Sequence, residues 1–150
     1  MIDHQALLPH RGAIMLVDTV GACEPGRSIT TYKAVTHADL AYADLPVDAP
    51  AEAFVFPPTL ILESFVQSGA VLWLSAADKA EGVLVFAGAK NVVFHQSVLP
   101  GDLLRHEVRV ERVLGDNVFL SGEVWVGTEM VAKIGSVAAA VRPPAVLDQA

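Results

Sequence analysis

A single carboxylate lies in the middle of an otherwise apolar segment. Residues 57–72 read PPTLILESFVQSGAVL, with Glu63 near the centre and Gln67 four residues later, which is about one helical turn. Removing an unpaired carboxylate from water is costly, so buried carboxylates are paired, neutral or used for chemistry. Glu63 is therefore a candidate for proton transfer. The alternative is a structural carboxylate capped by Gln67 or by backbone groups.

The other residue types that carry chemistry form weaker patterns. Five histidines are present without HxxxH spacing or a His/Cys cluster, so we expect no metal site. The sequence has no glycine-rich phosphate loop, and we expect no cofactor. The single cysteine, Cys23, cannot form an intramolecular disulfide. A chain without an intramolecular disulfide fits a reducing cytoplasm. We expect Cys23 to be a small buried side chain.

Two further segments accompany the Glu63 segment: LPHRGAIMLVD at residues 8–18 and AGAKNVVFHQSVLPGD at residues 87–102. Together the three segments resemble the 3-hydroxyacyl-acyl-carrier-protein dehydratases of bacterial fatty-acid synthesis. The matches keep the family's order and span nearly the whole chain: LPHR (8–11), LVD (16–18), LILE (60–63), Gln67, AG (87–88) and PGD (100–102).

The resemblance implies a reaction, a fold and an assembly. Members remove water from 3-hydroxyacyl thioesters carried by an acyl carrier protein, which requires a base for the C2 proton and an acid for the departing hydroxyl. The resemblance assigns the acid to Glu63, with Gln67 in support. It also implies a hotdog fold, in which an antiparallel sheet wraps one long helix. The resemblance further implies dimers in which each active site combines the base of one subunit with the acid of the other.

The family's base is a histidine in a GHFP segment before the helix, and this chain differs there. The corresponding segment is ADLP (43–46), which puts Asp44 at the histidine position. Aspartate is a weaker base than histidine for a carbon acid, and the alternative role for Asp44 is a solvated loop carboxylate. His37, in VTHAD, is a second candidate for the missing base. His10, in LPHR, is expected to hold local structure through hydrogen bonds.

The start of the helix also differs from the family, whose PGV sequence presents a glycine N–H to the thioester oxygen. Here the sequence is PPT, so Pro58 stands at the glycine and has no N–H to donate. The N–H of Thr59 can replace that donor only if the start of the helix is rebuilt. We expect Pro58, Thr59 and Leu60 to lie in the substrate-binding site.

The apolar pattern predicts the elements that must position these residues. Beginning at Pro57 and Pro58, which suit a helix start, one helix should run to about Ala77. We expect a short apolar element at 12–22, a proline-rich loop at 43–58, strands at 29–36, 83–94, 102–114, 117–126 and 130–141, and turns at 115–117 and 127–129. One long helix with an antiparallel sheet is an α+β fold.

Residues in the strand at 102–114 should alternate between two faces. Leu104, Val108 and Val110 share one face, and Arg105, Arg109 and Glu111 share the other. Four basic residues are expected to form a local group: Lys90, Arg105, Arg109 and Arg112. Acyl carrier proteins are acidic, so such a patch would steer their docking. The alternative is a solvated strand face balanced by glutamates.

Composition limits the partners and the compartment. The 150 residues suit one domain, 1–150, with residues 143–150 as a loose tail. A net charge of −7 and a pI near 5.0 disfavour nucleic acid as a partner. The N-terminus lacks the features of a signal peptide. Glu63, Gln67 and three serines make residues 60–77 a core helix rather than a membrane span, so we expect a cytoplasmic protein.

Three hypotheses for the function follow. The first is a dehydratase-family subunit of fatty-acid or polyketide biosynthesis, which joins Glu63 to a histidine from a paralogous partner in a heterodimer. The second is an active homodimeric dehydratase or isomerase with a rebuilt loop, in which Asp44 or His37 is the base. The third is a non-catalytic acyl-chain binder or scaffold. A thioesterase of the same fold, in which Glu63 activates water, is a further enzyme alternative.

Overall fold

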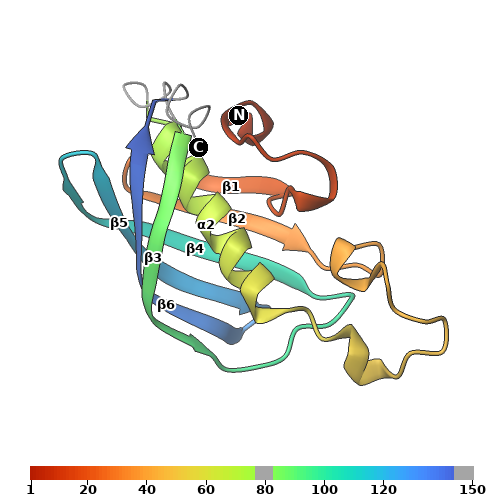
Figure 1. The fold of residues 1–150 in the computed structure, drawn as a ribbon. Helices are drawn as coiled ribbons and strands as arrows, with labels where there is room; N and C mark the ends of the chain where they lie inside the picture. Colours follow the sequence, from red (N-terminus) through yellow and green to blue (C-terminus); the bar gives the residue numbers. More distant parts are fainter. Residues whose placement is uncertain (77–82, 144–150) are drawn as a thin grey trace.

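The computed structural model describes residues 1–76 and 83–143. Six antiparallel strands form one sheet in the order β1-β2-β4-β5-β6-β3, and helix α2 crosses one of its faces (Figure 1). The strands are β1 (Thr19–Glu24), β2 (Ser28–Ala34), β3 (Val83–Phe94), β4 (Leu103–Leu114), β5 (Asn117–Val126) and β6 (Glu129–Arg142). The helical elements are α1 (His4–Leu7), α2 (Pro58–Leu74) and the 3₁₀ turns η1 (Gly12–Ile14), η2 (Leu40–Tyr42) and η3 (Ala51–Phe54).

Helix α2 is the centre of the fold because the sheet bends around it (Figure 1). Phe65, Val71 and Leu72 are completely buried. The stretch Ala51–Leu74 is long and apolar enough to cross a membrane by composition alone, yet 56% of its most apolar 18-residue window is buried inside the fold. A helix that is apolar nearly all round suits such a core position. The arrangement confirms the predicted α+β class and the hotdog fold.

The helix is shorter than the sequence analysis predicted. It ends at Leu74 rather than near Ala77, because Ser75 caps it. The Ser75 N–H donates to the Val71 carbonyl at 2.9 Å, and its hydroxyl donates to the Leu72 carbonyl at 2.8 Å. Residues 77–82, and all but the first residue of the predicted tail at 143–150, lie outside the described residues.

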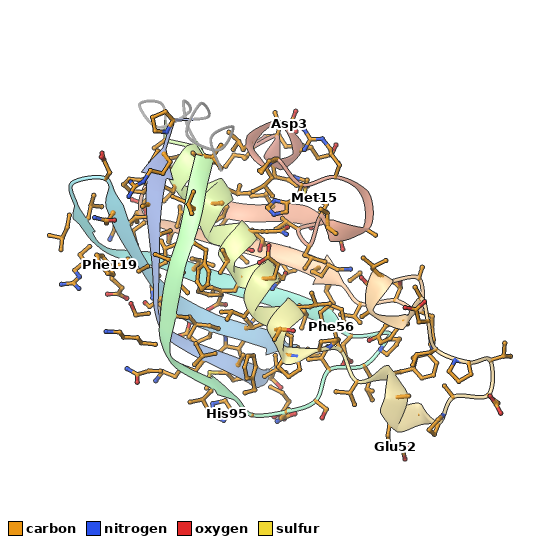
Figure 2. The ribbon with its side chains drawn as sticks, in the orientation of Figure 1. Asp3, Met15, Glu52, Phe56, His95 and Phe119 are labelled. Carbon is orange, nitrogen blue, oxygen red and sulfur yellow. The ribbon has the colours of Figure 1, made fainter. Side chains whose placement is uncertain are left out.

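Two other boundaries differ from the prediction. The strand predicted at 29–36 is β2 and ends at Ala34, since the Thr36 N–H donates to Asp39 Oδ2 at 2.7 Å and begins a turn. The element predicted at 12–22 divides into η1 and the first part of β1. The loop that follows β2 projects away from the sheet with Glu52 on it, and returns at Phe56 beside the start of α2 (Figure 2).

The alternation predicted for β4 is confirmed from Leu104 to Arg109 and is lost after the register shift between Val110 and Arg112. Leu104 and Val108 are buried, whereas Arg109 and Glu111 are exposed. His106 lies two residues from both Leu104 and Val108, so it falls on the same buried face. Its side chain is completely buried. The sequence analysis assigned no special environment to this residue, although its spacing from Leu104 and Val108 was the signal.

Strand β3 lies at the edge of the sheet, and among the described residues it pairs with β6 alone. Four of its apolar side chains remain 37–48% exposed: Val85, Phe86, Val93 and Phe94. A long edge strand with exposed apolar side chains is a ready surface for pairing with another chain. The fold therefore has one edge suited to association.

Two glycines allow close packing between α2 and the sheet. Gly69 of α2 faces Leu120 of β5, and Gly122 of β5 lies against the carbonyl of Glu107 and the ring of Phe65. A methyl group added at either glycine would overlap these atoms. At Gly122 the nearest obstacle is backbone, which cannot move aside as a flexible side chain can.

We expect Gly122→Ala to lower the free energy of unfolding by about 1–3 kcal/mol, the usual cost of overpacking a core. Urea denaturation followed by circular dichroism measures this change. Gly88→Ala is the matched control, because among the described residues the added methyl group would have no atom within 4 Å other than those of Gly88 and its two chain neighbours. Equal stability of the two variants would show that β4 and β5 can separate at this point without cost.

Candidate active site

Glu63 lies where two cavities meet. It is on α2, its side chain is 43% exposed, and with His10 it lines one cavity of about 270 Å³ and another of about 400 Å³. The first cavity is also lined by Val83, Leu84 and Phe86 of β3, and the second by Ile14, Leu40 and Leu60. A molecule that enters either cavity therefore meets the carboxylate.

Gln67 holds that carboxylate in a single orientation. The Leu16 N–H donates to Gln67 Oε1 at 2.8 Å. A backbone N–H can only donate, so the amide oxygen must face Leu16 and the amide nitrogen must face the other way. That nitrogen donates to the Ile14 carbonyl at 2.9 Å and to Glu63 Oε1 at 3.1 Å. The backbone of the N-terminal segment thus determines the direction of the donor that Glu63 receives.

His10 approaches the same carboxylate oxygen. Its Nε2 lies 3.5 Å from Glu63 Oε1. The sequence analysis gave His10 only a local structural role. The LPHR match was the available signal, but the long separation between His10 and Glu63 along the chain concealed the contact.

A buried polar network lies beneath this group. Ser64 Oγ donates to the Leu16 carbonyl at 2.7 Å, so it accepts from His106 Nε2–H at 2.8 Å. His106 Nδ1 lies 3.2 Å from Thr31 Oγ1, and Thr31 Oγ1 lies 2.6 Å from Ser68 Oγ, whose hydroxyl donates to the Ser64 carbonyl at 2.8 Å. Both ring nitrogens therefore have a hydroxyl group within hydrogen-bond distance. Burial lowers the pKa of His106 to about 4, which keeps it neutral at physiological pH.

The turn after β2 forms a wall of the second cavity. Lys33 Nζ and Asp39 Oδ1 form a buried ion pair at 2.8 Å. Asp39 lines the cavity and also accepts from the Thr36 N–H. Burial, together with the nearby carboxylates of Asp39 and Asp102, raises the pKa of Tyr42 to about 12. These interactions fix the turn against β2.

Comparison with known proteins agrees with this geometry. A family model described as a FabA-like domain matches residues 8–135. The chain belongs to this FabA-like family. The resemblance inferred from the LPHR, LILE and PGD motifs is therefore confirmed.

Two curated relatives are 3-hydroxyacyl-[acyl-carrier-protein] dehydratases named FabZ. The protein of Clostridium kluyveri is 33% identical over 132 residues, which cover 87% of this chain and 88% of the relative. The protein of Symbiobacterium thermophilum is 36% identical over 127 residues, which cover 85% and 87%.

Solved structures share the fold. A chain of the dehydratase heterocomplex ApeI:P from Xenorhabdus doucetiae matches with a TM-score of 0.79 over 97% of this chain and 95% of the other, at 14% identity. An uncharacterized protein from Pyrococcus horikoshii matches with a TM-score of 0.66 over 89% of both chains, at 17% identity.

Neither candidate for the missing base lies beside Glu63 in this FabA-like chain. Asp44 is exposed and lines neither of the two cavities that Glu63 lines. His37 is exposed, and its ring packs on Phe54 with the ring centroids 5.1 Å apart. Their proposed roles as bases stay predictions.

The start of α2 divides the predicted substrate-binding residues. Leu60 lines the second cavity, whereas Pro58 lies in a separate pocket beside the end of β3. The N–H groups of Leu60 and Ile61 both donate to the Pro57 carbonyl. The Thr59 N–H has no hydrogen-bond partner within the described part of the chain, and Thr59 is exposed. A free N–H at a helix N-terminus is a possible donor to a ligand.

The predicted docking residues are partly engaged within the chain. Arg105 pairs with Glu107, and Arg109 forms a two-fold hydrogen bond with Glu123 that raises the pKa of Arg109. Arg112 lies over the ring of Phe119 at 4.2 Å. Lys90 is exposed on β3, which β5 and β6 separate from β4 in the sheet, so the prediction that it clusters with the three arginines is wrong. Docking of a carrier protein at this group stays a prediction.

No group of three or more histidine, cysteine, aspartate or glutamate residues within residues 1–76 and 83–143 is arranged to hold a metal ion. What the arrangement offers is a carboxylate with a fixed orientation in a partly apolar cavity. Such a group can donate or accept a proton at one position of a bound molecule.

We expect His106 to make the fold sensitive to acid. Its pKa is about 4 in the folded protein against 6.5 as the ordinary value, so between these values the unfolded chain binds a proton that the folded chain does not. The free energy of unfolding should therefore fall as the pH is lowered through this range. Between pH 7 and pH 4.5 the contribution of His106 is about 2 kcal/mol.

Urea denaturation at the two pH values measures this loss. His106→Gln should lose less stability than the wild type between pH 7 and pH 4.5, whereas the exposed His95→Gln should behave as the wild type. The same loss in the wild type and in His106→Gln would contradict the prediction.

Proposed function

We propose that this chain is a subunit of a cytoplasmic dehydratase in fatty-acid or polyketide biosynthesis. It removes water from 3-hydroxyacyl thioesters carried by acyl carrier protein, with Glu63 as the general acid. The observation that carries the proposal is the carboxylate of Glu63, held by Gln67 on the central helix at the junction of two cavities. The names of the FabZ relatives describe this reaction and support the assignment.

The surroundings of Glu63 suit the parts of such a substrate. The second cavity, with Ile14, Leu40 and Leu60 in its wall, fits an apolar acyl chain. The free N–H of Thr59 lies one helical turn before Glu63 on the same face. It is a donor for the thioester oxygen, where enolate charge develops. Thr59 would then serve in place of the donor that Pro58 cannot provide.

The base comes from a second subunit. Asp44 stands at the family's histidine position and lines neither cavity around Glu63. The exposed apolar edge of β3 supports pairing with another chain, and Phe86 of that strand lines one of the cavities. A chain paired there covers this cavity and brings its own side chains close. The ApeI:P dehydratase, which has a similar fold, is itself a heterocomplex.

A homodimer is the second candidate. The edge of β3 fits another copy of this chain equally well, and the exposed Asp44 and His37 are free to reach a neighbouring subunit. In that assembly one of these two residues is the base. A non-catalytic acyl-chain binder would use the same cavities without turnover, and the experiment below separates the three.

We expect the purified chain alone to dehydrate 3-hydroxyacyl carrier-protein substrates at least about a thousandfold more slowly than its complex with a histidine-bearing paralogue. The chain alone has Asp44 at the family's base position, and the paralogue supplies the histidine that is missing there. Enoyl-thioester formation measures both rates. Asp44→Asn in the complex is the control and should change turnover by less than about twofold. In a heterodimer Asp44 takes the base position of the second site, whose acid is not Glu63 of this chain, and we expect that site to be inactive.

Turnover of about 1 per second or faster by the chain alone would favour the active homodimer. Abolition of turnover by Asp44→Asn would identify Asp44 as the working base. A complex that binds acyl thioesters without turning them over would favour the binder.

A further inference from the structure

His10 reaches Glu63 from outside the helix. Its Nε2 lies 3.5 Å from Glu63 Oε1, the oxygen that also accepts from Gln67. Contacts of this kind are often long in an unliganded site and shorten when the substrate binds. Within the described part of the chain, Glu63 Oε2 has no hydrogen-bond partner. Two nitrogen groups thus converge on one oxygen of the carboxylate and leave the other for a ligand.

The LPHR segment holds the backbone of His10 in place independently of Glu63. Leu8 is buried and anchors the segment in the core. Arg11 Nη1 donates to the carbonyls of Leu8 and His10, at 2.6 Å each. These two hydrogen bonds close the backbone around His10. The arginine of the motif therefore positions the histidine, and the histidine meets the carboxylate.

The second ring nitrogen of His10 argues against a proton relay through the imidazole. Nδ1 is buried, and no described residue is its hydrogen-bond partner. A relay passes a proton in at one nitrogen and out at the other, so both need partners. Only Nε2 has a polar neighbour, Glu63 Oε1 at 3.5 Å, which can accept a proton. The ring proton therefore belongs on Nε2.

We propose that His10 is a positioning residue for Glu63. It donates through Nε2–H to Oε1, beside Gln67, and turns Oε2 toward the reacting hydroxyl of the substrate. This inference rests on the proposed role of Glu63 as the general acid, and it assigns a function to the histidine of LPHR.

The proposed step accounts for every atom. The base removes the C2 proton, the C2–H electron pair forms the C2=C3 double bond, and the C3–O bond breaks. The proton on Glu63 Oε2 moves to the departing oxygen, which leaves as water. Glu63 becomes a carboxylate in this step, and the two donors at Oε1 stabilise the charge as it forms.

The test compares His10→Gln with His10→Leu in the complex with a histidine-bearing paralogue. Glutamine keeps an N–H donor near the position of Nε2, whereas leucine removes it. We expect His10→Gln to keep kcat within about threefold and His10→Leu to lower kcat by about 10- to 100-fold, with KM within about twofold of the wild type. His4→Leu, the same change in the neighbouring α1, should leave kcat and KM unchanged.

Two kinetic results would overturn the inference. Equal loss of kcat in His10→Gln and His10→Leu would show that the imidazole itself exchanges protons, and wild-type kcat in both would show that the contact does not act on Glu63. Thermal unfolding of each complex identifies a variant that has lost its fold. If His10→Leu fails to fold, the kcat of His10→Gln and the measurement below decide.

Nitrogen NMR of histidine labelled with ¹⁵N gives a result that does not depend on turnover. We expect His10 to carry its proton on Nε2 and its signal to move in Glu63→Gln. A proton on Nδ1 would overturn the inference even in an active complex. An inactive wild-type complex in which His10 gives the expected signal would instead contradict the proposed function and leave the contact with Glu63 supported.

Discussion

The hydrogen bond from the Leu16 N–H to Gln67 decides how the rest of the site is arranged. It leaves the amide of Gln67 only one orientation, in which the amide nitrogen must face Glu63 and the Ile14 carbonyl. The same bond ties the N-terminal segment to α2, and that segment carries His10 to the carboxylate. The loss of this hydrogen bond would therefore release Glu63 and His10 together.

Leu16 also connects the site to the core. The Leu16 N–H donates to Gln67, and the Leu16 carbonyl accepts from the hydroxyl of Ser64. That hydroxyl in turn accepts from the buried His106. A buried network whose members are all satisfied favours one arrangement over its alternatives. This explains why an otherwise apolar helix carries Ser64, Gln67 and Ser68 at spacings of three and four residues, on one face. The polar residues in the helix hold it in one rotation against the sheet.

The sequence was most informative where the spacing is local. The spacing of four positions from Glu63 to Gln67 predicted their contact, and the alternation of β4 indicated the burial of His106. The contact of His10 with Glu63 joins distant segments, so no period in the sequence reveals it. The end of α2 at Leu74 depends on capping by Ser75, and the placement of Asp44 depends on an irregular loop. Neither the end of the helix nor the placement of Asp44 has a periodic signal in the sequence. The hotdog fold and the family were predicted from the motif match.

The central claim is that the carboxyl group of Glu63 gives a proton to the departing hydroxyl. The most direct test is kcat for dehydration by the complex with a histidine-bearing paralogue, measured for the wild type and for Glu63→Gln. Glutamine keeps the shape but cannot donate a proton as a carboxylic acid does, so we predict that kcat falls by at least about 100-fold while the thioester still binds. Retention of wild-type kcat in Glu63→Gln would contradict the account.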